Sequence, residues 1–253
     1  MKILITGGNG YIAKSINNTL WDRYHILAPG RNELDLTDTK SVNNFFEGKV
    51  FDCVIHTAVK GGSRLIEDDQ IVLLDNILMM TNLHSQKDKF LKLINLGTGA
   101  EHLPTNYGKS KKWCNDLVNK TENWHTARIY GVFDENELDT RFIKSNIKRY
   151  INDEPIIIHQ DKIMDFIYMP DLVSIVENII LGNINDKEVD CVYEDTVSLS
   201  LIAKWINNLS NYKVPINYNS NVLAEHYIGL PKDLDLNYVG LEQGIKNVYD
   251  KLK

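Results

Sequence analysis

The segment from Lys2 to Ala13 (KILITGGNGYIA) constrains the fold more than any other part of the chain. An apolar, β-branched run leads through three glycines in four positions into a helical pattern. A helix that starts this way turns its unpaired N–H groups and positive dipole end toward the turn, where a pyrophosphate binds. The alternative to a pyrophosphate-binding turn is an ordinary glycine-rich turn that binds no ligand, since the glycine spacing alone is a weak signal. We expect a dinucleotide to contact Gly7, Asn9, Gly10, Tyr11 and Ile12.

Strand and helix patterns alternate along the first 130 residues. Short apolar runs predict further strands at residues 24–28, 51–56, 90–96 and 124–130. Helical patterns separate them at residues 12–20, 38–47, 68–86 and 107–120. Such alternation builds right-handed βαβ units and a parallel sheet covered on both faces. Ligands bind beyond the carboxyl ends of these strands, so the loops that follow them are expected to line one crevice.

The pattern weakens after about residue 150. Short strands are expected at residues 155–159 and 165–168, and helices at residues 170–181, 198–208 and 241–252. The predicted fold class is α/β, a Rossmann-type doubly wound parallel sheet with a small C-terminal α/β substrate-binding region. We expect residues 1–150 to form the cofactor-binding domain. Residues 151–253 are expected mainly to bind substrate, with some segments returning to the sheet.

Composition narrows the classes of partner. The net charge of −6 and the lack of a basic run argue against nucleic acid and anionic membranes. No signal peptide is recognised before the first strand, and no apolar run approaches the roughly 20 residues of a membrane helix. Cys53, Cys114 and Cys191 are far apart and lack metal-ligand spacing. We therefore expect reduced thiols, no metal site and a cytoplasmic location.

Tyr107 and Lys111 are four residues apart on a predicted helix and share one face. A tyrosine ionises near pH ~10, and a nearby ammonium favours the phenolate, which allows proton exchange closer to neutral pH. Thr98 follows a predicted strand and is placed to donate a hydrogen bond to a substrate oxygen. Tyr249 and Lys253 have the same spacing with no strand end nearby, so spacing alone carries little weight. Position therefore selects Thr98, Tyr107 and Lys111 as the catalytic candidates.

Arg31 follows the predicted strand at 24–28 and bears on the choice of cofactor. An acidic residue at this place binds the ribose hydroxyls of NAD, whereas an arginine suits the 2′-phosphate of NADP. The first carboxylate after the strand is Glu33. We therefore expect NADP(H) to be preferred, with NAD(H) as the alternative cofactor. If Arg31 binds no phosphate, it is an ordinary arginine in a solvated loop.

Four motifs in order resemble the extended short-chain dehydrogenase/reductase family, of the NAD-dependent epimerase/dehydratase type. They are TGGNGYIA at 6–13, IHTA at 55–58, Tyr107-x-x-x-Lys111 and DFIYMPDL at 165–172. Within that family, RNELDLTD at 31–38 and AVKGG at 58–62 look most like GDP-fucose synthases and, less closely, dTDP-4-dehydrorhamnose reductases. The resemblance implies a nucleotide-sugar substrate and the same catalytic trio. It also implies adenine contacts from Asp35 and Leu36, and Thr57, Ala58 and Asn76 along the cofactor or supporting the site.

Departures from that pattern limit the reaction. By resemblance, Ala100 stands at the position of the acid/base cysteine of GDP-fucose synthases, and Arg141 stands at the position of their histidine. Both groups of an epimerising enzyme are thus replaced, which argues against 3,5-epimerisation. Gly99 and Ala100 follow Thr98 in place of the Asp-Glu of dehydratases. Thr98 and Tyr107 are only nine positions apart, so a loop of the family is shortened. Met164 replaces a usual arginine of the family. Arg141, Lys144 and Lys148 share one helical face, and Arg141 and Lys144 are the candidates to replace it in substrate binding, with a solvated basic face as the alternative.

These observations predict an NADP(H)-dependent reductase of a 4-keto nucleotide sugar. A nucleotide-sugar 4-epimerase that retains its NAD(P), and a non-catalytic dinucleotide-binding sensor, are the alternatives. The resemblance also implies a homodimer in which the helices at 68–86 and 107–120 pair with their two-fold mates. Apolar residues on several sides of the first of these helices agree with that expectation.

Overall fold

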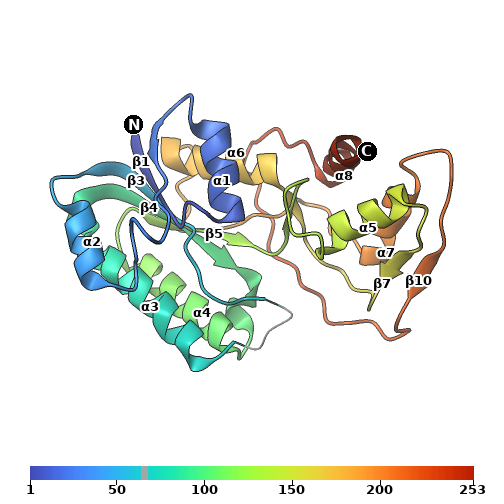
Figure 1. Cartoon of the computed structure of the whole chain (residues 1–253), viewed down its shortest axis with the longest axis horizontal. Coiled ribbons are helices and arrows are strands. Elements are labelled where there is room, and N and C mark those ends of the chain that lie inside the picture. Colours follow the sequence, from blue (N-terminus) through green and yellow to red (C-terminus); the bar gives the residue numbers. More distant parts are fainter. Residues whose placement is uncertain (64–67) are drawn as a thin grey trace. The chain divides into compact units, whose positions relative to one another are not determined.

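A six-stranded sheet is the centre of the first of two units (Figure 1). The computed structural model describes residues 1–63 and 68–253. The strands lie in the order β2 (His25–Leu27), β1 (Lys2–Thr6), β3 (Phe51–His56), β4 (Phe90–Thr98), β5 (Trp124–Ile129) and β9 (Glu188–Asp190). This unit comprises Met1–Arg128 and Ile175–Val189. The expected α/β parallel sheet is confirmed.

The strand order creates a switch point between β1 and β3. Both neighbours of β1 run parallel to it, with Ile3 opposite Ile26 on β2 and opposite Cys53 on β3. The chain leaves β1 toward β2 on one side and later returns to β3 on the other side. The loops after β1 and β3 therefore diverge at the carboxyl edge, where ligands bind in sheets of this kind.

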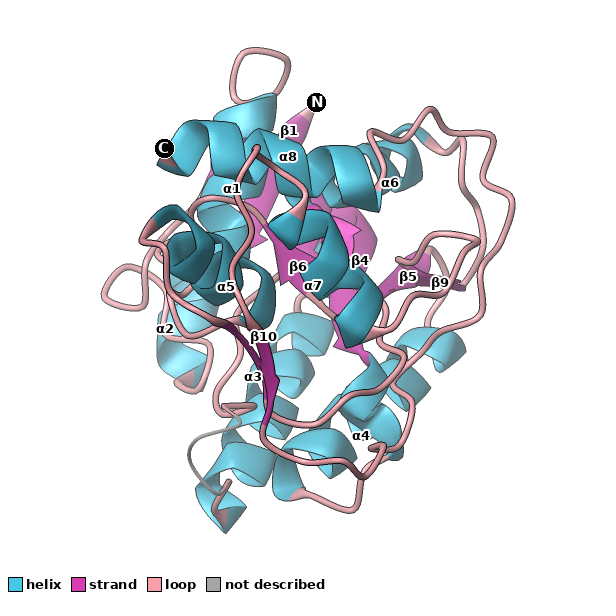
Figure 2. Ribbon diagram, turned by 90° about the vertical axis from the view of Figure 1, so that its right-hand side faces the viewer, coloured by secondary structure: helices cyan, strands magenta, loops and turns pink. Residues whose placement is uncertain are grey.

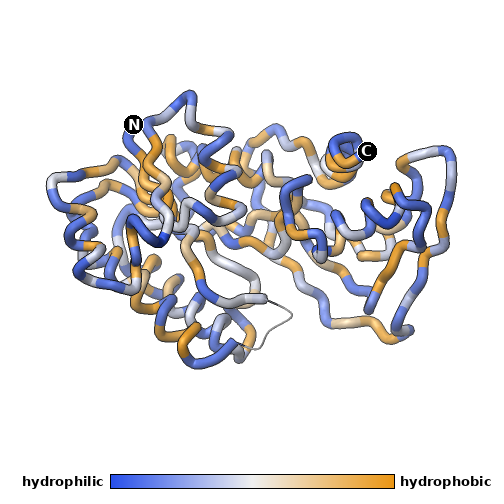
Figure 3. Tube along the Cα trace, viewed as in Figure 1, coloured by the Kyte–Doolittle hydropathy of each residue, from blue (hydrophilic) through white to orange (hydrophobic). Residues whose placement is uncertain are grey.

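Helices cover both faces of this sheet (Figure 1). One face carries α1 (Tyr11–Leu20) and the C-terminal part of α6 (Met169–Leu181), and the other carries α3 (Gln70–Ser85) and α4 (Asn106–Lys120). The helix α2 (Thr39–Phe46) contacts α3. The central strands β1, β3 and β4 are mainly apolar, as the orange stretches of the tube in Figure 3 show, because helices cover both faces of the sheet.

Aromatic rings close the core at the end of the sheet next to α2. Phe46 is fully buried, and its ring meets those of Phe51 and Phe90 at centroid distances of 5.8 Å and 6.3 Å. Edge-to-face and tilted contacts of this kind add to the free energy gained by burying the rings. They fix α2 against the start of β3 and β4.

The second unit comprises Ile129–Ser174 and Asp190–Lys253. Its helices are α5 (Phe142–Ile151), α7 (Leu199–Asn207) and α8 (Leu241–Leu252). Two small parallel pairs accompany them, β7 (Ile156–Ile158) with β10 (Ile216–Tyr218) and β6 (Val132–Phe133) with β8 (Ile167–Tyr168) (Figure 2).

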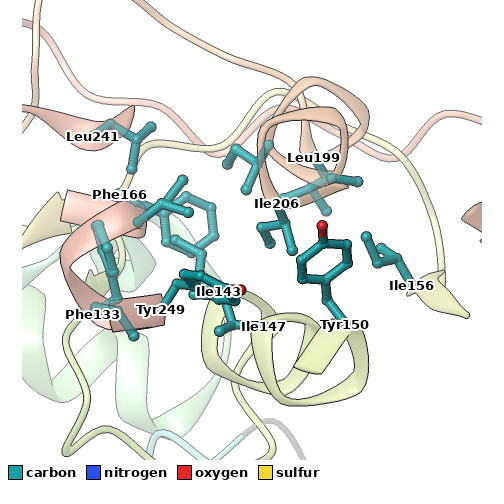
Figure 4. Close-up of a cluster of buried hydrophobic side chains, with 14 of the residues drawn as sticks. Phe133, Ile143, Ile147, Tyr150, Ile156, Phe166, Leu199, Ile206, Leu241 and Tyr249 are labelled. Atoms are coloured by element: carbon teal, nitrogen blue, oxygen red, sulfur yellow. The ribbon is translucent and has the colours of Figure 1, made fainter. Parts of the chain in front are cut away.

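Side chains from the three helices form the core of the second unit. Ile143, Ile147 and Tyr150 on α5 are fully buried and gather with Ile206 on α7 and Tyr249 on α8 (Figure 4). The Tyr150 ring stacks on Tyr212 with centroids 4.5 Å apart, and each hydroxyl donates a hydrogen bond to the other residue's carbonyl. This unit therefore has a hydrophobic core of its own.

The boundary expected near residue 150 is wrong. Residues 129–150 belong to the second unit, because the apolar face of α5 packs on α7 and α8. In the other direction, residues 175–189 belong to the first unit, where β9 extends the sheet.

The two aspartates of the DFIYMPDL motif anchor irregular backbone within the second unit. Asp165 accepts a hydrogen bond from the Gly229 N–H at 2.7 Å. Asp171, which is buried, accepts hydrogen bonds from the Val239 and Gly240 N–H groups and from the Tyr193 hydroxyl. The carboxylates thus satisfy backbone N–H groups of a segment that has little regular structure.

Within the two described ranges, no helix combines the length and the apolar composition needed to cross a membrane.

Candidate active site

The glycine turn after β1 packs directly against the loop after β3. Gly7 has a φ of +68°, and a Cβ built on it would lie 2.9 Å from the Ala58 Cα. A Cβ on Gly8 would lie 2.0 Å from the Ala28 carbonyl oxygen, beyond the end of β2. Only glycine fits these two positions, the first for its backbone conformation and the second for space. The turn therefore holds the ends of three strands together.

No side chain of the described residues caps α1 at Gly10. The first N–H groups of a helix lack partners within the helix, and a phosphate at that end satisfies them and interacts favourably with the dipole. Tyr11 and Ile12 occupy the first two positions of α1. The arrangement that the sequence predicts for a pyrophosphate is thus present in the backbone.

A pocket of about 370 Å³ opens beside this turn, at the switch point of the sheet. Eight predicted cofactor residues line it: Gly7, Asn9, Gly10, Arg31, Asp35, Leu36, Thr57 and Ala58. Six lining residues were not predicted as cofactor contacts: Leu34, Thr37, Val59, Lys60, Asp75 and Met79. The loop residues among them lie next to predicted ones, whereas Asp75 and Met79 reach the pocket from α3, one helical turn apart. The predicted residues Tyr11, Ile12 and Asn76 are not among its lining residues.

Arg31 stands at this pocket with its side chain 69% exposed. Its Nε lies 3.1 Å from Asp35 Oδ2, and its Nη2 donates to Thr37 Oγ1 at 3.4 Å. Burial disfavours the charged form of Asp35, but hydrogen bonds from Thr37 and Arg31 outweigh it and hold the pKa of Asp35 below its ordinary value. The guanidinium is therefore held in place by an anion while most of its surface stays open to solvent.

Asn76 supports the site from beneath the loop after β3. Asn76 lies on α3 and is 3% exposed. Its amide oxygen accepts a hydrogen bond from the Lys60 N–H at 2.9 Å. Its amide nitrogen donates to the Lys60 carbonyl and to Ser110 Oγ, each at 3.0 Å. Ser110 in turn donates to the Tyr107 carbonyl at 2.7 Å. One buried amide thus ties the loop, α3 and the first turn of α4 together.

The three catalytic candidates lie where β4 leads into α4. Thr98 ends β4 and begins a short 3₁₀ helix, η2 (Gly99–His102), and Tyr107 and Lys111 lie on the first turns of α4. A Cβ on Gly108 would lie 2.4 Å from the Ala100 carbonyl oxygen, so α4 begins directly against η2. The shortened loop therefore keeps the strand end and the start of α4 in contact.

The Tyr107 ring packs on the loop after β3. A Cβ on Gly62, whose φ is +75°, would lie 2.8 Å from Tyr107 Cζ. Asp68 fixes this loop, because its carboxylate accepts from the Gly62 N–H and its carbonyl accepts from the Asn106 side chain at the start of α4. Gly62 of the AVKGG segment thus leaves the space that the phenol end of the Tyr107 ring occupies.

Lys111 is 5% exposed, and its ammonium donates to the Leu96 carbonyl on β4 at 2.6 Å. Burial lowers its pKa, and the thiol of Cys114 and the carboxylate of Glu101 oppose that effect. Burial and the Lys111 charge together lower the pKa of His56 to about 3, so this histidine is neutral at physiological pH. His56 shares a hydrogen bond of 2.9 Å with the Thr6 hydroxyl and has a structural role.

The predicted substrate residues Arg141 and Lys144 belong to the second unit. Arg141 precedes α5 and is exposed, whereas Lys144 lies 2.9 Å from Asp139 and donates to the Glu137 carbonyl. Burial raises the pKa of Glu137 to about 8, although the hydrogen bond that its carboxylate accepts from the Lys144 N–H and the charge of Arg141 both act to lower it. Substrate binding by Lys144 requires the exchange of its present partners, and the role of both residues stays a prediction.

Residues 1–63 and 68–253 contain no cluster of three His, Cys, Asp or Glu side chains suited to a metal ion.

The Asn76 contacts predict a loss of stability combined with a local opening. Asn76→Ala removes a buried amide with three hydrogen bonds and should lower the free energy of unfolding by roughly 1–3 kcal/mol, measured by urea denaturation. The Lys60 amide should also exchange its hydrogen faster, since its acceptor is gone.

Asn82 is the matched control, because it is also buried on α3 but bonds the Leu36 carbonyl and Thr39. Asn82→Ala should cost similar stability and leave exchange at Lys60 unchanged. Equal protection of Lys60 in the wild type and in Asn76→Ala would contradict the role given to Asn76.

Comparison with known proteins agrees with this geometry at three levels. Residues 1–69 match the family model described as the RmlD substrate binding domain. A GDP-L-colitose synthase from Yersinia pseudotuberculosis is 32% identical over 105 residues, which cover 40% of this chain and 34% of that protein. A GDP-L-fucose synthase from Azorhizobium caulinodans is 33% identical over 104 residues, 39% of this chain and 33% of that protein. The matched part thus spans about a third of these curated relatives.

Solved structures share the fold over nearly the whole chain. A GDP-mannoheptose C4 reductase from Campylobacter jejuni with NADP bound has a TM-score of 0.81 at 17% identity, covering 98% of this chain and 97% of that one. A UDP-glucose 4-epimerase from Thermotoga maritima has a TM-score of 0.82 at 17% identity, covering 100% and 98%. The solved structures thus show the fold, and the family model and the two synthases add to the ordered motifs a similarity to the extended short-chain dehydrogenase/reductase family over the first part of the chain.

Proposed function

We propose that this protein is an NADP(H)-dependent reductase of a 4-keto nucleotide sugar. The observation that carries the proposal is the grouping of Thr98, Tyr107 and the buried ammonium of Lys111 at the carboxyl end of β4. The same unit holds a pocket formed by the glycine turn and the loop after β3. A proton donor near a dinucleotide pocket is what carbonyl reduction requires.

The residues present fit a dinucleotide. Gly7 and Gly8 leave the room that a Cβ would fill, and α1 begins beside them without a side-chain cap in the described structure. Arg31 offers an exposed guanidinium for a 2′-phosphate, already oriented by Asp35. Bound NADPH would supply the hydride for the sugar carbonyl carbon.

The chain's own residues would handle the proton and the oxygen. The Thr98 hydroxyl would donate a hydrogen bond to the carbonyl oxygen, and the Tyr107 hydroxyl would deliver a proton to it. The Lys111 ammonium, held by the Leu96 carbonyl, would stabilise the resulting phenolate and contact the nicotinamide ribose. These roles need no metal and no covalent intermediate.

The substrate class rests on the relatives. The matched synthases are named for GDP-L-colitose and GDP-L-fucose, and one structural neighbour is named a GDP-mannoheptose C4 reductase. Ala100 in place of a cysteine favours reduction without 3,5-epimerisation. A 4-epimerase that retains its cofactor is the second candidate, favoured by the epimerase neighbour, and Arg31 argues against it because the epimerases of this family generally retain NAD.

A binding protein without catalysis is the third reading. The presence of Thr98, Tyr107 and Lys111 together argues against it. We also propose a cytoplasmic location, which the three buried cysteines, none of them in a disulfide, support.

Arg31→Ala tests the cofactor assignment. A charge-assisted contact to phosphate contributes roughly 1.5–3 kcal/mol, so the variant should bind NADPH about tenfold or more weakly and NADH nearly as before. Fluorescence titration with both cofactors measures the effect, and Arg23→Ala, at an exposed arginine outside the pocket, is the control. Equal weakening for both cofactors, or a wild type that prefers NADH, would rule out a 2′-phosphate contact.

Tyr107→Phe tests the proton donor on a 4-keto nucleotide sugar that the wild type reduces. Turnover should fall by roughly 10² to 10⁴ through loss of general acid catalysis, while the ring still packs on Gly62 and NADPH binding stays nearly unchanged. Tyr249→Phe is the control, since Tyr249 has the same spacing to a lysine and lies in the core of the second unit. Near wild-type turnover by Tyr107→Phe would show that another group is the acid.

We further propose that the protein is a homodimer. Ile71, Leu74 and Leu78 form an exposed apolar stripe along α3, and Trp113 on α4 is also exposed. Large exposed apolar side chains grouped on two neighbouring helices are typical of a subunit interface, and two-fold dimers are the commonest closed assembly.

Leu74→Glu should convert the dimer to a monomer, because it places two charges at the two-fold interface. Light scattering at micromolar concentration should give twice the chain mass for the wild type and for Leu91→Glu, which alters a comparably exposed leucine at the start of β4. A wild type that is monomeric, or a Leu74→Glu protein that remains dimeric, would contradict this interface.

A further inference from the structure

Glu101 is a charged residue buried directly beside the catalytic candidates. It lies in η2, three residues after Thr98, and is 4% exposed. Its Oε1 accepts a hydrogen bond from the Thr98 N–H at 3.2 Å, while the Thr98 hydroxyl accepts from the Ala100 N–H at 3.3 Å. This reciprocal capping box fixes the backbone at the point where β4 delivers Thr98 to the site.

The second oxygen of Glu101 faces an arginine from another strand. Arg128 on β5 donates to Oε2 through Nε at 3.3 Å and through Nη2 at 3.2 Å, and its Nη2 also contacts Glu188 on β9. The Arg128 side chain is 11% exposed, so the pair is shielded from water. Removing one member of such a pair is costly, because it leaves the other charge buried without compensation.

The backbone around Glu101 makes room for its carboxylate. A Cβ on Gly97 would lie 2.8 Å from Glu101 Oε1 and 2.6 Å from the Thr126 methyl group. Glycine at 97 is therefore the residue that lets the carboxylate reach the Thr98 N–H from below the end of β4.

Glu101 and the ammonium of Lys111 approach the same stretch of β4, since Lys111 donates to the Leu96 carbonyl and the Glu101 carboxylate lies against Gly97, the next residue. The other titratable groups acting on Lys111 in the described structure are His56 on β3 and Cys114 on α4, and Tyr107 shares its face of α4. His56 is neutral, and burial raises the pKa of the Cys114 thiol to about 11, so neither supplies an anion at neutral pH. Burial raises the pKa of Glu101, while Arg128, the Thr98 N–H and Lys111 favour its ionised form.

We propose that Glu101 is a positioning residue of the reductase site, which holds the Thr98 backbone with one oxygen and sustains the charge of Lys111 through its carboxylate. The inference rests on the proposed function for its catalytic meaning, whereas its effect on Lys111 stands independently. The chain thus uses an Arg128–Glu101 pair to keep a buried ammonium charged at the end of β4.

The direct test is a titration of Lys111 in the cofactor-free protein. Lysine labelled with ¹³C at Cε reports the protonation of each ammonium by NMR, and the signal missing in Lys111→Met identifies Lys111. In Glu101→Gln the Lys111 signal should titrate at lower pH than in the wild type, because a neighbouring negative charge has been removed. An unchanged midpoint would overturn the proposal.

Glu177→Gln is the matched control for this change. Glu177 belongs to the same unit and also pairs with an arginine, Arg23, at 2.7 Å. Its substitution should leave the Lys111 titration and turnover at wild-type values. A shift of Lys111 in Glu177→Gln as large as in Glu101→Gln would mean that the effect is not specific to Glu101, and it would also overturn the proposal.

Turnover provides the second readout. The kcat of Glu101→Gln should fall about tenfold, which corresponds to the loss of one charge-assisted hydrogen bond. The high-pH limb of its kcat profile should move to lower pH, because loss of an anion lowers the pKa of both Tyr107 and Lys111. Glu101→Asp keeps the charge but not the reach to Thr98, so its kcat should fall while its limb stays at the wild-type pH. It also serves as the test if Glu101→Gln does not fold.

The outcomes separate this inference from the proposed function. The role of Glu101 alone would be overturned if Tyr107→Phe is inactive while Glu101→Gln keeps the wild-type kcat and pH profile. The same conclusion would follow if Tyr107→Phe is inactive while Glu101→Asp keeps the wild-type kcat. Full activity of Tyr107→Phe would instead overturn the catalytic assignment, and the Lys111 titration would still decide the electrostatic part.

Discussion

The buried ammonium of Lys111 is the interaction on which the candidate site depends. A lysine at 5% exposure is costly unless its charge is compensated. The Leu96 carbonyl accepts from its ammonium at 2.6 Å, and we propose that the Glu101 carboxylate supplies the compensating charge. Because the Leu96 carbonyl belongs to β4, this hydrogen bond fixes α4 against that strand. Tyr107, one helical turn earlier, is placed by the same contact and by the loop residue Gly62.

The pocket beside the glycine turn depends on a different constraint, the close approach of two loops. Gly7 meets Ala58 at a distance that a side chain would block, and Asn76 holds the next part of that loop from α3. Because Asn76 also bonds Ser110, which bonds the Tyr107 carbonyl, the pocket and the start of α4 share one network of buried hydrogen bonds. The pocket and the catalytic candidate Tyr107 are therefore not independent features.

Local sequence patterns predicted elements of both units. The strand Phe51–His56 and the helix Leu241–Leu252 have the bounds that their apolar periodicity predicts, and the glycine turn forms as expected. The strand β9 was missed, since three residues with acidic ends carry no strand signal and pair only because the sheet edge is there. Glu101 was missed for a similar reason: it resembles a solvated charge, and its partner Arg128 is 27 residues away on another strand. Long-range contacts of this kind, and the boundary near residue 129, depend on packing that no local pattern encodes.

The most direct test of the central claim follows NADPH absorbance while the purified protein is incubated with a panel of 4-keto nucleotide sugars. Reduction consumes one NADPH for each sugar converted, and the product carries a hydroxyl at C4. We expect stoichiometric loss of NADPH with at least one member of the panel, and a GDP-linked sugar is the first choice because both matched synthases are named for GDP-linked products. Conversion of a nucleotide sugar to its C4 epimer without net NADPH loss, or binding of NADPH with no turnover of any member, would contradict the account.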